Sequence, residues 1–317
     1  MTIGLLGYQT TISDAITIAG TGVHSGAAVS ITFHPAEADS GIVFQRVHDR
    51  RVISEYRAVS SQVGNTDLCT VLGFSAATSI ATIEHVMAAL YALGLDNVLI
   101  EVHGAEMPIM DGSSSVFIDA IDQVGLTPLA VKRRYIRVTK RVRVESGASW
   151  AEFSPYDGTR FEVEIDFDCP LIGRQAWKGD LTPATFRTEL ARARTFGFMR
   201  DVERLWAAGY ALGSSLENSV VISDDNTVIN VEGLRFKDEF VRHKTLDAVG
   251  DLSLAGAPFI GCYRSYRGGH KMNANALKAL LSDRSAYEVV ETSSPRARPG
   301  QRELIAVTAP EFAPWSA

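Results

Sequence analysis

Two runs of short strands, each followed by helices, constrain the fold of this chain more than any other feature of its sequence. In the first run, the stretches 28–33 and 41–44 alternate apolar and polar residues, which predicts strands. Apolar residues then recur at helical spacing over 80–93, followed by a strand at 97–102 and a helix at 115–124. The first half is therefore expected to contain strands, a helix, a strand and a helix.

The second half roughly repeats this order. Apolar residues alternate with charged ones over 136–144 and 161–167, which predicts half-exposed antiparallel strands. The later elements expected are helices near 184–192, 199–207, 235–252 and 273–283 and strands near 218–222 and 258–263. With a boundary near residues 125–132, the sequence predicts an α+β protein of two similar domains, 1–128 and 129–317. Each would be a mainly antiparallel sheet with helices packed on it.

One helix predicted in the second half carries a stripe that changes from apolar to polar. Phe236, Phe240, His243 and Asp247 share a face, and Asp251 continues the row. The spacing of His243 and Asp247, one helical turn, lets an imidazole and a carboxylate share one cation. The alternative is a solvated face on which such residues form weak ion pairs.

Glu84 and His85 interrupt an otherwise apolar, small-residue helix at 82–90. Ionisable groups are costly to bury unless they are paired, so both residues call for partners. Consecutive helical side chains diverge by about 100°, so the two flank one site only if it lies obliquely beside the helix. His85 as a metal ligand and Glu84 as a base satisfy that geometry. A hydrogen-bonded core histidine beside an exposed glutamate is the alternative.

Two further segments contain residue types suited to a site. His270 follows two glycines that let a loop approach a ligand closely, although a surface turn explains the pattern almost as well. The segment 191–199 combines arginines, a threonine and phenylalanines, which suits either a ligand-binding wall or a basic helix end packed by aromatic rings. No metal is assigned to the remaining histidines: His24, a weak candidate for lining a site, and His34, His48 and His103.

Composition excludes several classes of protein and site. A net charge of −6 disfavours binding to a phosphate backbone, so nucleic acid is not an expected partner. Cys69, Cys169 and Cys262 are odd in number and far apart, which argues against a disulfide framework and a thiolate zinc site. No stretch approaches the roughly 20 apolar residues needed to span a bilayer, and the N-terminus does not resemble a secretory signal. A cytoplasmic protein is predicted.

The segments that carry these residues occur in a fixed order along the chain: Gly-Val-His-Ser-Gly (22–26), Thr-Ile-Glu-His-Val-Met-Ala-Ala-Leu (82–90), Pro-Ile-Met-Asp-Gly-Ser (108–113), Ala-Arg-Thr-Phe-Gly-Phe (193–198), Asp-Glu-Phe-Val-Arg-His-Lys-Thr-Leu-Asp (238–247) and Gly-His (269–270). Together they resemble the zinc-dependent UDP-3-O-acyl-N-acetylglucosamine deacetylases, over nearly all of residues 10–290. The resemblance implies a layered β-α-α-β sandwich with the active site between the domains. It also implies the committed step of lipid A biosynthesis, in which the acetamide of UDP-3-O-acyl-N-acetylglucosamine is hydrolysed.

The resemblance assigns roles to individual residues. His85, His243 and Asp247 match the zinc ligands, leaving a position open for water, and ferrous iron is the alternative ion in the cell. Glu84 matches the general base and His270 the histidine opposite it. Further residues match groups that support the reaction: Lys244, Asp251 and Thr195.

The implied mechanism follows from these roles. Glu84 takes the proton of the attacking water, while Thr195 and zinc steady the oxyanion. His270, kept protonated by Asp251, offsets negative charge or protonates the leaving amine, a role that Glu84 could also fill.

The resemblance also implies how the substrate is held. Phe196 matches a residue that lines the sugar site, and an inserted element near 195–221 forms a passage for the fatty chain. The residues expected there are Met199, Val202, Leu212, Leu216 and Val221. Family members carry a lysine near the phosphates where this chain has Ser149, so other basic groups would have to bind the diphosphate. A monomer is expected.

Two other functions are compatible with the same residues. A zinc amidase for another acylated sugar or peptide would keep the metal and Glu84 without a preference for the UDP group. A non-enzymatic protein would use the metal only to hold two halves together, with Glu84 and His270 taking no part.

Overall fold

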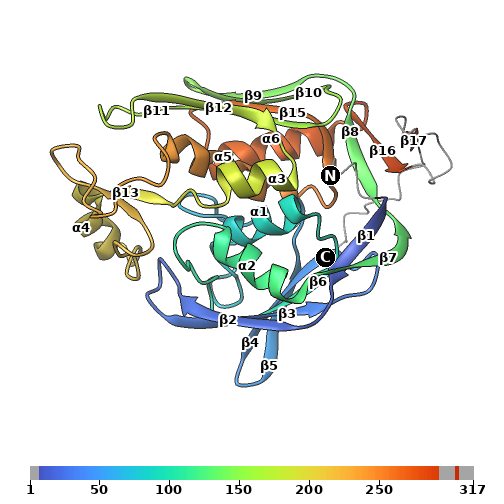
Figure 1. The fold of residues 1–317 in the computed structure, drawn as a ribbon, viewed down its shortest axis with the longest axis horizontal. Coiled ribbons are helices and arrows are strands. Elements are labelled where there is room, and N and C mark those ends of the chain that lie inside the picture. Colours follow the sequence, from blue (N-terminus) through green and yellow to red (C-terminus); the bar gives the residue numbers. More distant parts are fainter. Residues whose placement is uncertain (1–6, 293–303, 307–317) are drawn as a thin grey trace.

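The computed structural model describes residues 7–292 and the backbone of residues 304–306. These residues form an α+β fold in which two layers of helices lie between two sheets (Figure 1). The expected β-α-α-β sandwich is therefore confirmed. The division into domains 1–128 and 129–317 stays a prediction, because its boundary falls inside a strand and its end lies outside the described residues.

One outer sheet is built from the first half of the chain, in the order β2-β3-β6-β4-β5. Neighbouring strands are antiparallel except β4 and β6, which are parallel. In β3, Val29, Ile31 and Phe33 are buried and alternate with more exposed residues, as in a sheet with one face on the core. The strands are β2 (Ile16–Thr21), β3 (Ala28–Pro35), β4 (Ile42–His48), β5 (Arg51–Arg57) and β6 (Val98–His103).

The other outer sheet comes from the second half, in the order β12-β11-β15-β8-β16-β17, with β10 paired to β15 and β9 paired to β10. The strand expected at 161–167 corresponds to β11, which is antiparallel to β12 but parallel to β15. The parallel neighbour arises because the long connection before β15 contains a helix. The strands are β8 (Arg134–Val138), β9 (Val142–Ser146), β10 (Ser149–Ser154), β11 (Thr159–Asp166), β12 (Arg174–Asp180), β15 (Phe259–Tyr266), β16 (Tyr287–Thr292) and β17 (Leu304–Ala306). A separate antiparallel pair consists of β1 (Tyr8–Ile12) and β7 (Leu126–Lys132).

The inner layers contain α1 (Glu84–Leu93) and α2 (Ser115–Val124) on one side and α5 (Glu239–Ser253) and α6 (His270–Ser282) on the other (Figure 1). Nearly every residue of α1 and α5 is buried, because each helix is covered by a sheet and by the other helix layer. The two helices meet at Gly250, where a Cβ atom would lie 2.0 Å from the carbonyl oxygen of Glu84. A glycine is therefore required for the backbones to approach this closely.

The helices differ from the sequence expectation in four places. α1 begins at Glu84 rather than near residue 80, because Thr82 has a left-handed φ of 59° that interrupts helical geometry. α6 begins at His270 rather than near 273, and α5 at Glu239 rather than 235. The helix expected at 184–192 is a short turn, α3 (Pro183–Thr185), that continues as the π-helix η2 (Phe186–Leu190). A single-turn 3₁₀ helix, η1 (Ser60–Gln62), precedes α1.

A small insert lies beside the layers in Figure 1 and contains β13 (Phe196–Phe198), α4 (Met199–Ala207) and β14 (Val220–Ile222). β13 and β14 are parallel. The insert contacts the first half where the backbone N–H of Leu212 donates to the carbonyl oxygen of His24 at 3.1 Å. Within the described residues, no helix is both long and apolar enough to cross a membrane.

Candidate metal centre

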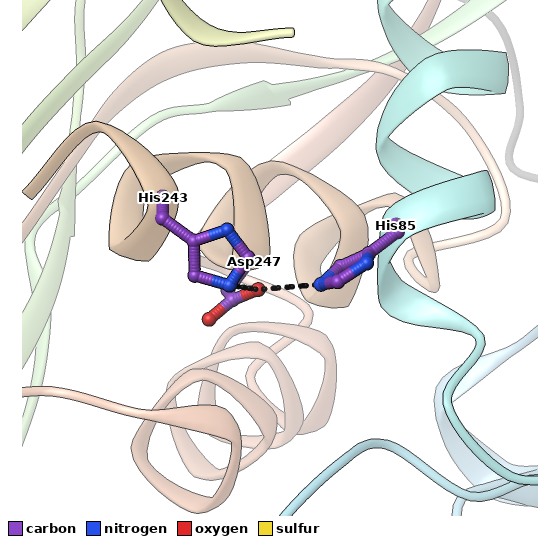
Figure 2. Close-up of side chains that lie close together, drawn as sticks. All are labelled: His85, His243 and Asp247. Carbon is purple, nitrogen blue, oxygen red and sulfur yellow. Dashed lines mark ion pairs between the residues drawn. The ribbon is translucent and has the colours of Figure 1, made fainter. Parts of the chain in front are cut away.

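Three side chains able to bind a cation meet where α1 faces α5. His85 lies in the first turn of α1, and His243 and Asp247 lie one turn apart on α5 (Figure 2). The Nε2 atoms of His85 and His243 are 3.6 Å and 3.3 Å from Oδ1 of Asp247. One ligand atom from each residue lies within 4.8 Å of the other two. The structure thus brings together the three residues predicted as metal ligands.

The chemistry of this cluster fits a divalent cation. All three side chains are buried, and among the described residues Oδ1 of Asp247 has no hydrogen-bond partner. An unpaired buried carboxylate oxygen is costly, and a cation shared with two imidazoles would remove that cost. Burial lowers the pKa of His243 to about 3 despite the attraction of Asp247, so the ring is neutral, as a metal ligand must be. Two imidazoles and one carboxylate form a donor set that suits zinc.

Two neighbours hold the ligands on α5. Nδ1 of His243 lies 3.1 Å from the carbonyl oxygen of Ala193, which directs Nε2 towards the cluster. Lys244 donates from Nζ to Oδ2 of Asp247 at 2.9 Å. Burial acts to raise the pKa of Asp247, but His243 and Lys244 outweigh it, so this pKa lies well below its usual value. Asp247 is therefore ionised, and Lys244 contacts the ligand set directly.

Glu84 lies beside the cluster, next to His85 in the first turn of α1. Its Oε2 accepts a hydrogen bond from the backbone N–H of Thr70 at 2.9 Å, and its Oε1 is 3.9 Å from Nε2 of His270. Burial raises the pKa of Glu84, although His270 and His85 act in the opposite direction. Glu84 is only 3% exposed, which excludes the alternative of an exposed glutamate. A carboxylate in this setting is a strong proton acceptor.

His270 faces Glu84 from the first residue of α6. Its Nδ1 lies 2.9 Å from Oδ2 of Asp251, which also accepts a hydrogen bond from Nδ2 of Asn273 at 2.7 Å. Burial lowers the pKa of His270, but Asp251 and Glu84 outweigh it and raise the pKa to about 9. At neutral pH the ring therefore carries a positive charge on the side of the cluster that Glu84 also faces.

The polar face of α5 extends further than the sequence pattern indicated. Glu239, His243, Asp247 and Asp251 follow one another at intervals of one turn, and all four are buried. The predicted stripe started from Phe236 and did not include Glu239. A search for charged residues at four-residue intervals would have found it.

Thr70 is a second residue that sequence analysis missed. Besides the bond from its N–H to Glu84, it donates from Oγ1 to Oδ1 of Asp251 at 2.5 Å. It lies in a loop without periodicity, so no sequence signal marked it.

Thr195 and Phe196 lie at the edge of the site nearest the insert. The ring of Phe196 is 6.3 Å from that of His243 and 5.0 Å from that of Phe240. Thr195 is fixed through its backbone: its N–H donates to the carbonyl oxygen of Gly112 and its carbonyl accepts from Val220, both at 2.8 Å. The Pro-Ile-Met-Asp-Gly-Ser segment of the first half, 108–113, thus holds Thr195 in place.

The residues predicted for the fatty-chain passage lie in the insert, away from the metal ligands. Met199 is 48%, Leu212 53% and Leu216 43% exposed, and Val202 and Val221 are half-buried. These apolar side chains are spread over α4, the segment that follows it and β14.

Two other residues noted in the sequence have definite positions. Ser149 begins β10, opposite Ser146 of β9. His24 packs its ring edge-on against Tyr210 of the insert, with centroids 5.4 Å apart. Glu106 holds the loop that contains His24, because its carboxylate accepts hydrogen bonds from the N–H groups of His24 and Ser25 at 2.9 Å.

The arrangement is suited to hydrolysis. Beside the cluster of candidate ligands lie a buried carboxylate, Glu84, and an imidazolium, His270, 3.9 Å apart. Attack of water on an unreactive acyl group needs a base for the water's proton and positive charge near the developing oxyanion. Glu84 can supply the base, and His270 the positive charge.

Comparison with known proteins identifies one matching family and several relatives. Residues 9–282 match the sequence model of the family described as UDP-3-O-acyl N-acetylglycosamine deacetylase. The chain is 62% identical over 284 residues to a protein from Brucella ovis named UDP-3-O-acyl-N-acetylglucosamine deacetylase, an alignment that covers 90% of this chain and 99% of the relative. Proteins of the same name from Brucella abortus and Brucella melitensis show the same identity and coverage.

Proposed function

The chain belongs to the UDP-3-O-acyl N-acetylglycosamine deacetylase family, and on this basis we propose that it hydrolyses its substrate with a zinc ion held by His85, His243 and Asp247. The reaction removes the acetyl group of UDP-3-O-acyl-N-acetylglucosamine as acetate and leaves a free amine, the committed step of lipid A biosynthesis. One observation carries the proposal: Glu84 and His270 face each other beside a buried His-His-Asp cluster, in which Oδ1 of Asp247 has no hydrogen-bond partner among the described residues.

Zinc is the ion favoured by this donor set. Bound there, zinc would lower the pKa of a water molecule and polarise the acetamide carbonyl. His85, His243 and Asp247 would hold the ion with three protein ligands, the number typical of catalytic zinc sites that also bind water. Ferrous iron binds such sites more weakly at equilibrium, so it would replace zinc only where its availability is higher.

The chain's own residues move the protons. Glu84, held by the N–H of Thr70, takes the proton of the water that attacks the acetamide carbon. His270 is protonated beside Asp251, so it offsets the negative charge of the tetrahedral intermediate and stands ready to protonate the leaving amine. The hydroxyl of Thr195 donates to the oxyanion, and Lys244 keeps Asp247 ionised.

The substrate extends from this centre towards the insert. Phe196, whose ring lies against His243, lines the sugar site. The acyl chain then follows the apolar side chains of the insert: Met199, Val202, Leu212, Leu216 and Val221. Since Ser149 has no charge, basic groups other than residue 149 bind the diphosphate.

A direct test measures acetate release from UDP-3-O-acyl-N-acetylglucosamine. The metal-stripped full chain is assayed first and then again after addition of one equivalent of zinc. Activity is expected to appear only with zinc and to be inhibited by UDP. Acetate release without zinc would refute the metal mechanism. Activity that is unaffected by UDP and by acyl-chain length would favour an amidase for another acylated substrate.

We also propose that the protein is cytoplasmic and monomeric. The three cysteines, Cys69, Cys169 and Cys262, are buried free thiols, which suits the reducing cytoplasm. The monomeric state stays a prediction, to be checked by analytical ultracentrifugation.

A further inference from the structure

A buried ion pair lies one helical turn from the metal cluster. Glu239, the first residue of α5, is fully buried, and Arg194 is 1% exposed. Nε of Arg194 donates to Oε1 of Glu239 at 2.9 Å, and Nη2 donates to Oε2 at 3.3 Å. Nothing in the proposed reaction uses this pair.

The carboxylate of Glu239 also binds backbone. Its Oε1 accepts from the backbone N–H of Arg194 at 3.0 Å, and its Oε2 accepts from the backbone N–H of Arg235 at 2.6 Å. Only a carboxylate, which accepts through both oxygens and donates through neither, satisfies all these N–H groups at once. An amide in its place would direct an NH₂ group at donors.

The backbone segment that Glu239 holds also contacts the candidate metal ligand His243. Ala193 directly precedes Arg194, and its carbonyl oxygen is the partner of Nδ1 of His243 at 3.1 Å. Glu239 and His243 lie one turn apart on the same face of α5, so both contact the same short segment, 193–194. The hydrogen bond to Nδ1 sets the tautomer and the orientation of the ring.

From this contact chain we infer that Glu239 is a positioning residue of the metal centre. By holding Arg194 through main chain and side chain, it fixes the Ala193 carbonyl, which directs Nε2 of His243 at the ion. The inference rests on the proposed metal site and extends it to a residue that touches neither metal nor substrate. Without Glu239, the 193–194 segment would shift and His243 would lose its orientation.

Cobalt(II), bound to the metal-stripped full chain, tests this without any assay of activity. The d–d absorption spectrum reports ligand geometry, and titration gives the dissociation constant. Glu239→Gln is expected to weaken Co²⁺ binding about 10- to 100-fold, the usual effect of losing a group that supports a ligand, and to change the spectrum.

Asp96→Asn is the matched control. Asp96 forms a similar, partly buried pair with Arg133, at 2.7 Å, and accepts a backbone N–H from Thr10 at 2.9 Å. It lies beyond the C-terminal end of α1, whereas His85 lies in the first turn. This control should lose stability yet keep the wild-type cobalt spectrum and affinity.

Each outcome is decisive. Wild-type cobalt binding by Glu239→Gln would overturn the inference, as would equal losses in both variants, which would indicate general destabilisation. If Glu239→Gln does not fold, Glu239→Asp is measured instead, and it should show the same change because its carboxylate is withdrawn by one methylene. A wild-type spectrum there would overturn the inference. A wild-type chain that binds Co²⁺ but releases no acetate would refute the proposed function and leave this inference standing.

Discussion

His270 and Asp251 face each other across two helices, with Nδ1 of the ring 2.9 Å from a carboxylate oxygen. The two residues are 19 positions apart in the sequence, and only the resemblance to a family, not the residue pattern, predicted that Asp251 would keep His270 protonated. Asp251 keeps the ring of His270 charged at neutral pH, which places an imidazolium beside Glu84.

The pH dependence of the reaction should report this pair. Burial lowers the pKa of His270, but Asp251 and Glu84 raise it to about 9, so the ring is charged below that pH and activity should fall as pH rises through about 9. Asp251→Asn removes the nearer anion and should move this basic limb to lower pH. A profile of kcat/KM against pH gives the answer, and an unchanged basic limb would contradict the role of Asp251.

Loss of the base should affect turnover and leave metal binding intact. Glu84→Gln keeps an oxygen that can accept the N–H of Thr70 but cannot take a proton from water. Turnover is expected to fall about 10²-fold or more. Metal content is measured on the same sample, and loss of zinc would mean that Glu84 is a ligand instead.

Zinc should stabilise a chain that is already folded. At free zinc about 100-fold above its dissociation constant, the free energy of unfolding should rise by about 2.7 kcal/mol. His85→Ala should abolish this increase, whereas His34→Ala, a change at a half-exposed histidine of β3, should keep it. Denaturant melts with and without chelator measure it. Complete unfolding on chelation would instead favour a purely structural metal.

The insert should determine acyl-chain affinity. Leu212 is 53% exposed, so Leu212→Ala should leave stability unchanged while removing apolar contact with the acyl chain. If contact equivalent to about two methylenes is lost, at about 0.8 kcal/mol each, KM for the long-chain substrate should rise about tenfold with kcat nearly unchanged. Val231→Ala, at a fully exposed valine outside the insert, serves as the control. Equal KM values for long and truncated acyl chains in the wild type would count against the passage.

The close contact between α1 and α5 should depend on the absence of a side chain at Gly250. Gly250→Ala gains up to about 1 kcal/mol of helix propensity, but its Cβ would lie 2.0 Å from the carbonyl oxygen of Glu84. The clash outweighs the gain in helix propensity. We therefore expect a net loss of about 1–3 kcal/mol in unfolding free energy together with lower metal affinity. Gly7→Ala is the control, because its added Cβ would have its nearest neighbour 4.0 Å away, so the unfolding free energy should not change. Thermal melts of both variants measure the difference.

The sequence predicted the fold class and the central helices because their periodic apolar residues pack on sheets. It did not predict where α1 begins, since that depends on the left-handed backbone of Thr82, nor the parallel pairing of β11 with β15, since that depends on a distant crossover. Within the site, His243 and Asp247 were recognisable from spacing on one helix. His85, Glu84 and His270 come from other elements, so only the resemblance to a family grouped them before their distances were known.

Two residues that contact the site were missed for local reasons. Thr70 binds two carboxylates from a loop whose residues have no period. Glu239 was overlooked because the apolar Phe236 and Phe240 define a neighbouring stripe, and its partner Arg194 lies far away in the chain.

The polar row on α5 limits which changes in chain length this protein tolerates. Glu239, His243, Asp247 and Asp251 occupy one face only because each follows the last by four residues. Inserting or deleting a single residue between them would rotate every later member by about 100° and carry it off that face. Gaps in alignments of working relatives should therefore be absent from α5 and should gather in the insert around α4, whose residues all keep some exposure.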